Sequence, residues 1–170
     1  IGTLKWEMED LSFRALDPIN FKRIATLLEE RRTERELFIK QFSEKLKNLI
    51  NEQQVAADVS GRVKHIVSIW RKMQRKKLEF HQLFDVRAVR VMVKNVADCY
   101  AVLGIVHTNW RSIPSEFDDY IANPKDNGYQ SLHTAVMTAD GRVVEVQIRS
   151  YEMHEKSEFG VASHWRYKEG

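Results

Sequence analysis

Apolar residues recur at helical spacing along three long stretches of the chain, which extend from Asp17 to about Asn51, from Ile66 to Lys77 and from Val96 to Trp110. This spacing, with charged residues between the apolar ones, predicts three amphipathic helices, the first of them broken near Arg31. The first stretch opens with an Asp-Pro pair, in which the aspartate can cap the helix and the proline suits its first turn.

Shorter runs with the composition of strands lie between and after these helices. We predict strands at Gln54 to Val59, Leu83 to Val93, Leu132 to Thr138 and Arg142 to Ile148. The turn pair Asp140-Gly141 separates the last two runs and predicts an antiparallel hairpin. A closing helix is expected from Tyr151 to Tyr167. The order of elements therefore predicts an α/β fold with a mixed β-sheet flanked by helices.

Length and composition indicate how many domains the chain can form and in which compartment the protein is expected. With 170 residues, 43% of them apolar, the chain can bury one core, and we expect a single domain over residues 1–170. The only cysteine, Cys99, can form no intramolecular disulfide, and no leader or long apolar run predicts export or a membrane segment. We expect a cytoplasmic protein. The start at Ile1 and the charged end at Gly170 suggest a piece excised from a longer multidomain protein.

The basic residues are unevenly distributed, although the net charge is only +3. Residues 61–72 contain no acid, and Ser68 and Lys72 lie one helical turn apart near the start of the second predicted helix. Arg62 and Lys64 precede them. Helix N-termini favour anions, so these four residues predict a binding site for a polyphosphate. The sequence contains neither a Walker loop nor a dinucleotide-binding glycine pattern, so such a site would be built differently. A solvated basic face is the alternative interpretation.

Two acidic residues lie inside or at the start of apolar strands. Asp85 opens one predicted strand, and Glu145 lies within another, on one face with Gln147 and Arg149. If the two strands are neighbours, both carboxylates could hold one Mg²⁺, which prefers carboxylates together with phosphate oxygens and water. The alternative is that both acids lie on a solvated sheet face.

The stretch from Tyr120 to Thr134 concentrates polar and aromatic residues around a turn. Tyr129 offers a flat ring on which a base could stack, while Lys125, Asn127 and His133 offer donors to phosphate. Equally, Tyr129 could be a packing residue of a hairpin, and His133 a buried histidine with its hydrogen bonds satisfied.

Four segments in order resemble the synthetase domain of the RelA/SpoT-type (p)ppGpp synthetases. They are Gly61-Arg62-Val63-Lys64-His65-Ile66-Val67-Ser68-Ile69-Trp70-Arg71-Lys72, Asp85-Val86-Arg87-Ala88-Val89-Arg90, Asn123-Pro124-Lys125-Asp126-Asn127-Gly128-Tyr129-Gln130-Ser131-Leu132-His133 and Val144-Glu145-Val146-Gln147-Ile148-Arg149. The resemblance covers nearly the whole chain. It implies a fold related to nucleotidyltransferases of the polymerase-β type.

The resemblance also implies an activity, which is the transfer of pyrophosphate from ATP to GDP or GTP in the stringent response. On the ATP side it assigns binding to Arg62, Lys64, Ser68, Lys72 and Arg90, with Arg62 and Arg90 sandwiching the adenine. Arg90 lies five positions after Asp85, and this odd offset would point the two side chains to opposite faces of a regular strand, so a bulge or a strand end between them is expected.

For the remaining residues the resemblance implies a metal site and a second nucleotide site. Asp85 and Glu145 would hold Mg²⁺ as the catalytic acids, and Glu145 would take the proton from the 3′-hydroxyl of the guanine nucleotide. Tyr129 would stack on the guanine. Lys125, Asn127 and His133 would meet the phosphates of that nucleotide.

The segment Glu116-Phe117-Asp118-Asp119 is acidic where bifunctional synthetase-hydrolases tend to carry basic residues at its first and third positions. The acidic version is associated with the synthesis-dedicated, RelA-like branch. Glu116 and Asp118 could attract a second Mg²⁺ or set specificity. Ribosome and tRNA contacts, in such a parent, would belong to other domains of the longer chain.

Two other functions remain open at this point. A different nucleotidyltransferase on the same scaffold would release pyrophosphate instead of AMP. A non-catalytic RNA-binding or regulatory domain would use the basic helix alone, although such a domain has no need of the paired acids.

Overall fold

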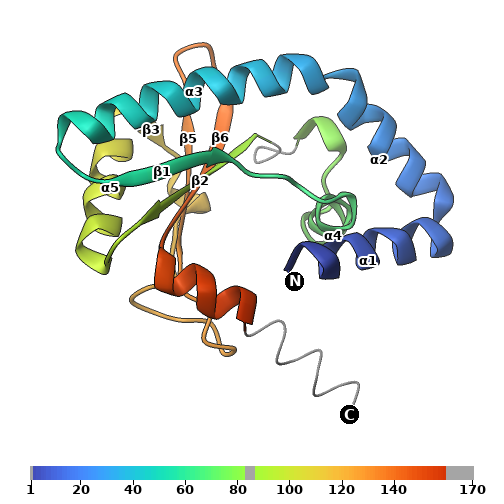
Figure 1. Cartoon of the computed structure of the whole chain (residues 1–170). Helices are drawn as coiled ribbons and strands as arrows, with labels where there is room; N and C mark the ends of the chain where they lie inside the picture. The colour runs from blue at the N-terminus through green and yellow to red at the C-terminus, as the bar shows by residue number, and fades with distance from the viewer. Residues whose placement is uncertain (1, 83–86, 160–170) are drawn as a thin grey trace.

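The computed structural model describes residues 2–82 and 87–159 (Figure 1). The elements are α1 (Gly2–Leu16), α2 (Pro18–Glu30), α3 (Arg32–Glu52), β1 (Ala57–Gly61), α4 (Ile66–Lys76), the 3-10 turn η1 (Phe80–Gln82), β2 (Ala88–Val93), α5 (Val96–Asn109), β3 (Arg111–Ser112), the 3-10 turn η2 (Pro114–Glu116), β4 (Asp118–Asp119), β5 (Leu132–Met137) and β6 (Val143–Ser150). Residues 151–159 form a further helix.

The strands form one mixed sheet in the order β1-β2-β6-β5-β3, with β4 also paired to β5. β2 and β6 run parallel, and the other pairs are antiparallel. The β5–β6 hairpin turns at Gly141, whose φ of +82° is a conformation that glycine adopts without strain. The predicted mixed sheet and hairpin are therefore confirmed.

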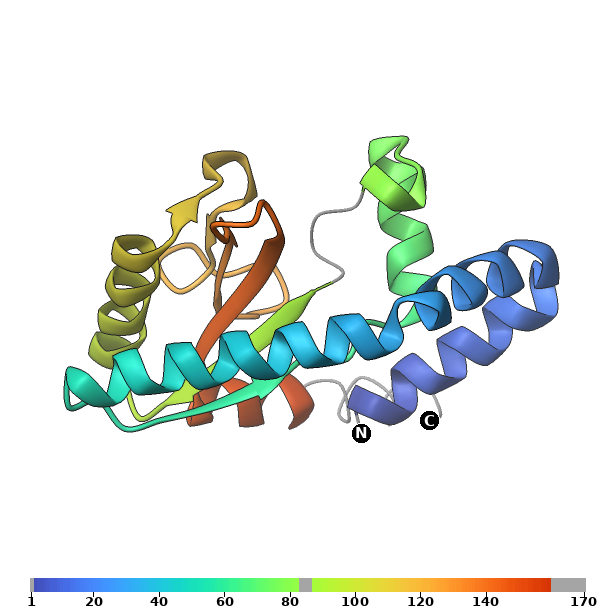
Figure 2. The same ribbon diagram turned by 90° about the horizontal axis from the view of Figure 1, so that it is seen from above.

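One face of the sheet is apolar and packs on two helices. Valines of β2 and β6, together with Ile148, lie fully buried on this face, against apolar residues of α3 and α5. The main helix residues in this core are Phe42, Leu46 and Ile50 of α3 and Cys99, Val102 and Val106 of α5. The opposite face carries the polar residues of the same strands. In Figure 2, α4 stands to one side of the sheet, away from the α5 end.

A second buried cluster joins α1, α2 and α4. Phe13, Ile24, Val67, Ile69 and Met73 form it, separately from the core of the sheet. The expectation of one core was therefore wrong. The basic helix needs its own apolar support, because its apolar stripe faces α1 and α2 instead of the sheet.

Several predicted boundaries are confirmed, and others shift. The side chain of Asp17 accepts a hydrogen bond from the N–H of Asn20, and the helix breaks at Arg31. The predicted strand at 54–59 begins three residues later, because α3 continues to Glu52 and Gln54 adopts a left-handed backbone conformation. In the described ranges, no helix is long and apolar enough to cross a bilayer.

Candidate active site

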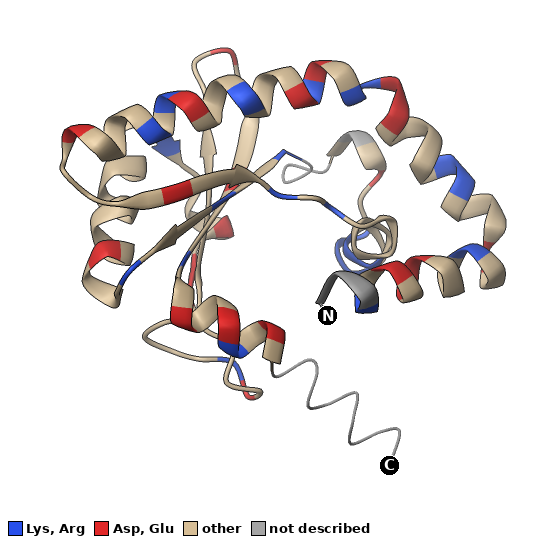
Figure 3. Ribbon diagram, viewed as in Figure 1, with Lys and Arg blue, Asp and Glu red and all other residues tan. Residues whose placement is uncertain are grey.

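A cleft of about 540 Å³ lies between α4 and the polar face of the sheet. It brings together most of the residues that the sequence singles out, namely Arg62, Lys64, Ser68, Lys72, Glu116, Asp118, Lys125, His133 and Glu145. Figure 3 shows basic residues gathered on α4. Arg90, Asn127 and Tyr129 are not among the residues that line it.

Glu145 is the third residue of β6 and is 8% exposed. Ala88 of β2 and Ala135 of β5 are its direct neighbours across the sheet. Residues that face each other across paired strands point to the same side, so two methyl groups flank the carboxylate. Small neighbours leave the space above the carboxylate open to the cleft.

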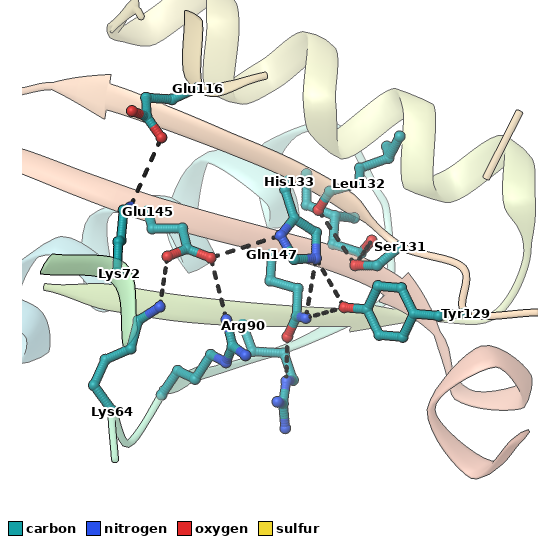
Figure 4. Close-up of polar contacts among 12 residues, drawn as sticks. Lys64, Lys72, Arg90, Glu116, Tyr129, Ser131, Leu132, His133, Glu145 and Gln147 are labelled. Atoms are coloured by element: carbon teal, nitrogen blue, oxygen red, sulfur yellow. Dashed lines mark hydrogen bonds and ion pairs between the residues drawn. The ribbon is translucent and has the colours of Figure 1, made fainter. Parts of the chain in front are cut away.

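Three nitrogens approach the Glu145 carboxylate (Figure 4). Lys64 Nζ donates to Oε2 at 2.7 Å, and Arg62 Nη1 donates to Oε1 at 3.1 Å. His133 Nδ1 lies 3.7 Å from Oε1. Both carboxylate oxygens therefore have a cationic partner, and the segment that precedes α4 is tied to the sheet.

The acids Glu116 and Asp118 face the same basic helix from the other wall. Lys76 Nζ lies 3.2 Å from Glu116 Oε1, and Lys72 Nζ lies 3.9 Å from Oε2. Asp118 pairs with His133 in the register of β4 and β5. The two acids are thus part of the cleft and separate from the Glu145 cluster.

The N-terminus of α4 already has an anionic partner from α1. Asp10 Oδ1 accepts a hydrogen bond of 2.8 Å from the N–H of Val67, and its Oδ2 lies 3.7 Å from His65 Nδ1. Trp6 stacks on His65 with 5.5 Å between ring centroids. One N–H group on which the predicted polyphosphate site relied is therefore occupied, which leaves the side chains of the basic segment as the main anion ligands.

The loop before β5 holds Tyr129 through contacts on several sides. Asn127 Oδ1 accepts from the N–H of Tyr129 at 3.0 Å, so Asn127 shapes the turn. Lys125 Nζ lies 5.2 Å from the centroid of the Tyr129 ring. The Tyr129 hydroxyl lies 2.8 Å from His133 Nε2. Burial, together with the nearby charges of Arg62 and Lys125, lowers the pKa of His133 to about 3, so its imidazole is neutral.

A cluster of arginines lies beyond this loop on the polar face. Burial first, and then the neighbouring Arg149 and Arg62, lower the pKa of Arg90 to about 10. Arg149 is 3% exposed, and its Nη2 donates to His154 Nδ1 at 2.6 Å. Buried guanidinium groups of this kind suit an electron-rich ring or an anion as a further partner.

Asp85 lies outside the described residues, as do its neighbours at 83, 84 and 86. Among the residues that the structure does describe, no group of three or more His, Cys, Asp or Glu side chains could hold a metal ion.

Sequence reasoning gave no role to Gln147, Arg149 or His154. The shared face of Glu145, Gln147 and Arg149 was the available signal, since it puts all three on the polar face of the sheet.

The mixed sheet, with helices on its apolar face and a charged cleft on its polar face, has the fold of the small alarmone synthetases. Small alarmone synthetase 1 from Bacillus subtilis bound to its product pppGpp matches with a TM-score of 0.66 and 25% identity, over 84% of this chain and 82% of that one. A GTP pyrophosphokinase family protein from Streptococcus pneumoniae matches with a TM-score of 0.64 and 29% identity, over 82% of this chain and 77% of that one.

Residues 61–170 match the family model described as the region found in RelA / SpoT proteins, and the chain therefore belongs to the RelA/SpoT family. The GTP pyrophosphokinase of Escherichia coli K12 is 59% identical over 170 residues, and that of Haemophilus influenzae is 55% identical over the same length. These matches cover all of this chain and 23% of each relative, so the chain spans about a quarter of their length.

Proposed function

We propose that this chain transfers a pyrophosphate group from ATP to the 3′-hydroxyl of GDP or GTP, and that residues 1–170 form one synthetase domain. The products would be ppGpp or pppGpp together with AMP. The observation that carries the proposal is the position of Glu145, in a cleft between a basic segment and the Tyr129 loop. The E. coli and H. influenzae relatives are named GTP pyrophosphokinases, and the B. subtilis neighbour is described with pppGpp as its product.

In this proposal the basic segment binds the phosphates of ATP. Arg62, Lys64, Ser68 and Lys72 line one wall of the cleft, and three of them are cationic. The phosphates would replace Glu145 as the partner of Lys64, because a polyphosphate offers more negative charge than one carboxylate. Arg90, in its buried arginine cluster, would stack on the adenine with Arg62.

Glu145 would then act as the general base. The 3′-oxygen of the guanine nucleotide attacks the β-phosphorus of ATP, and its proton passes to the Glu145 carboxylate. The bond between the β-phosphorus and the bridging oxygen to the α-phosphorus breaks, and AMP leaves with the electron pair. The alanines beside Glu145 leave room for both reacting groups.

The Glu145 carboxylate fits Mg²⁺ in its chemistry. It opens onto the cleft in which the ATP phosphates would lie, and a carboxylate together with phosphate oxygens is a ligand set that Mg²⁺ prefers. Asp85 joins Glu145 in this proposal on the sequence pattern alone. When bound, the ion would neutralise phosphate charge.

The guanine nucleotide would enter from the Tyr129 side. Lys125 and His133 line the cleft and point toward its phosphates in this proposal. Tyr129 lies next to both of them, within reach of a stacked base. Asn127 contributes by fixing the turn that presents the ring.

Product analysis tests the proposal. The chain is incubated with ATP, Mg²⁺ and GDP or GTP, and the nucleotides are resolved. Release of AMP with formation of ppGpp or pppGpp supports pyrophosphate transfer, whereas release of pyrophosphate supports another nucleotidyltransferase. Salt-sensitive binding of RNA without any turnover would support the non-catalytic alternative. Glu152→Gln, a change at an exposed acid on the helix at 151–159, is the control for Glu145→Gln.

A further inference from the structure

Gln147 occupies the centre of a row of polar residues that crosses the sheet. Arg90 of β2 and His133 of β5 are its direct partners on either side, and Ser60 and Asp118 continue the row on β1 and β4. Gln147 is 1% exposed. A buried amide is stable only when its hydrogen bonds are made, so its partners define what it does.

The amide contacts residues that belong to both proposed nucleotide sites. Arg90 Nε donates to Gln147 Oε1 at 2.8 Å, and Gln147 Nε2 donates to the Tyr129 hydroxyl oxygen at 2.5 Å. The Tyr129 hydroxyl lies 2.8 Å from His133 Nε2. Figure 4 shows this chain of contacts running from Arg90 through Gln147 to the Tyr129 and His133 pair.

The direction of these hydrogen bonds follows from the first of them. A guanidinium has donors only, so the amide must present its oxygen to Arg90 and its NH₂ to Tyr129. The tyrosine oxygen then accepts from Gln147, and the same NH₂ group lies 3.4 Å from His133 Nε2. Because Nε2 faces this donor, Nε2 accepts, and the tyrosine proton can donate to it at 2.8 Å. An Nε2 that accepts carries no proton, so a neutral His133 carries its proton on Nδ1, the nitrogen that faces Glu145 at 3.7 Å.

We propose that Gln147 is a positioning residue that links the two nucleotide sites and holds His133 as the Nδ1–H tautomer facing Glu145. The assignment of the two sites to ATP and to the guanine nucleotide rests on the proposed function, whereas the direction of the hydrogen bonds around Gln147 is independent of it. One amide shared by Arg90 and Tyr129 couples their positions: ordering the guanidinium against one nucleotide also orders the ring that receives the other.

The tautomer is measured by ¹⁵N NMR of histidine-labelled protein without nucleotide, with His133 assigned from the spectrum of His133→Asn. We expect a protonated Nδ1 and a bare Nε2. In Gln147→Glu a carboxylate accepts from both Arg90 and Tyr129, so the tyrosine proton turns away and His133 must donate from Nε2. A wild-type His133 with its proton on Nε2, or the same tautomer in folded wild type and folded Gln147→Glu, would overturn the proposal.

A second variant keeps the test decisive if Gln147→Glu does not fold. Gln147→Met removes the amide that donates to Tyr129 and whose nitrogen lies 3.4 Å from His133 Nε2, so His133 should lose its single tautomer and show both forms. Retention of a pure Nδ1–H form in folded Gln147→Met would contradict the proposed role of the amide. The amide spectrum of each variant establishes that it is folded.

The link between the two sites is measured by calorimetry with a non-hydrolysable ATP analogue and GDP. In the wild type each nucleotide should strengthen binding of the other by about 5-fold or more, as is usual for coupled sites. Gln147→Met should bind both without that coupling, and Gln41→Met, at an exposed position of α3, should retain it. Wild-type binding of both nucleotides without coupling, or coupling that persists in Gln147→Met, would overturn the link. Binding of neither nucleotide would instead refute the proposed function and leave the tautomer result intact.

Discussion

Lys64 Nζ donates to Glu145 Oε2 at 2.7 Å, so the proposed phosphate-binding cation and the proposed base are partners in the structure described here. Both side chains are largely buried. The pair keeps two opposite charges satisfied in the cleft, since a lone buried charge would be costly. The same pairing means that ATP must separate them before Glu145 can receive a proton.

Glu145→Gln should separate catalysis from ATP binding. Removal of a general base lowers turnover by about 10²- to 10⁴-fold. The affinity for ATP, measured by calorimetry, should stay equal or rise, because the amide competes less well with phosphate for Lys64. Glu152→Gln should change neither quantity. Loss of ATP binding in a folded Glu145→Gln variant would be inconsistent with this account.

Lys64→Met should weaken ATP binding and destabilise the fold. The variant leaves Glu145 with Arg62 as its remaining cationic partner, and loss of a hydrogen bond to a buried charge costs about 2 kcal/mol. Urea unfolding measures this change in the free energy of unfolding. Lys156→Met, which removes an exposed ion pair with Glu152, should cost under about 1 kcal/mol. Equal losses in the free energy of unfolding for the two substitutions would show that the Lys64–Glu145 contact stabilises the fold no more than an exposed ion pair does.

Glu116→Gln combined with Asp118→Asn should shift the Mg²⁺ dependence of turnover to higher concentrations. These acids line the cleft opposite the basic helix, and we propose that they would hold a second ion together with the nucleotide phosphates. The measurement is a Mg²⁺ titration of the initial rate at saturating nucleotide. Superimposable curves for wild type and variant would rule out a metal at these two acids.

His107 should make stability depend on pH. Burial lowers the pKa of His107 below its ordinary value of 6.5, and its Nε2 lies 2.7 Å from Thr134 Oγ1. The unfolded chain therefore binds a proton at this residue more readily than the folded chain does as the pH falls below 6.5. Its contribution to the free energy of unfolding is present above that pH and is lost as the pH falls toward the folded-state value.

Urea unfolding of wild type and His107→Gln across pH 7.5 to 4.5 checks this expectation. The difference in stability between the two proteins should shrink as the pH falls, because only the wild type loses stability by protonation of His107. A difference that is constant over this range would contradict the assignment.

The sequence predicted those elements whose pattern is long or marked by a turn. The helices α4 and α5 and the Asp140-Gly141 hairpin were found because periodicity and turn chemistry are local properties. The two short strands β3 and β4 were missed, since a strand of two residues is too short to show an alternation of apolar and polar positions. The helix α1 was missed as well. Its role, a cap on α4 through Asp10, depends on contact between distant segments.

The sequence predicted which residues belong to the site better than it predicted the contacts between them. Nine of the singled-out residues line one cleft, which follows from placing a basic segment and two strands around one sheet face. The role of Gln147 could not be predicted, because it arises from the cross-strand register of β2, β6 and β5. The turn of the β5–β6 hairpin fixes one of these registers, whereas the β2–β6 register joins segments far apart in the sequence, and no local pattern encodes it.

The most direct test of the central claim follows the phosphates of ATP into the products. ATP labelled on its γ-phosphate, and separately on its α-phosphate, is incubated with the chain, Mg²⁺ and GDP. The account predicts that the γ label appears in ppGpp, that the α label appears in AMP, and that Glu145→Gln slows the formation of both products by about 10²-fold or more. An α label transferred to any acceptor, with release of free pyrophosphate, would contradict the account, and so would unchanged product formation by Glu145→Gln.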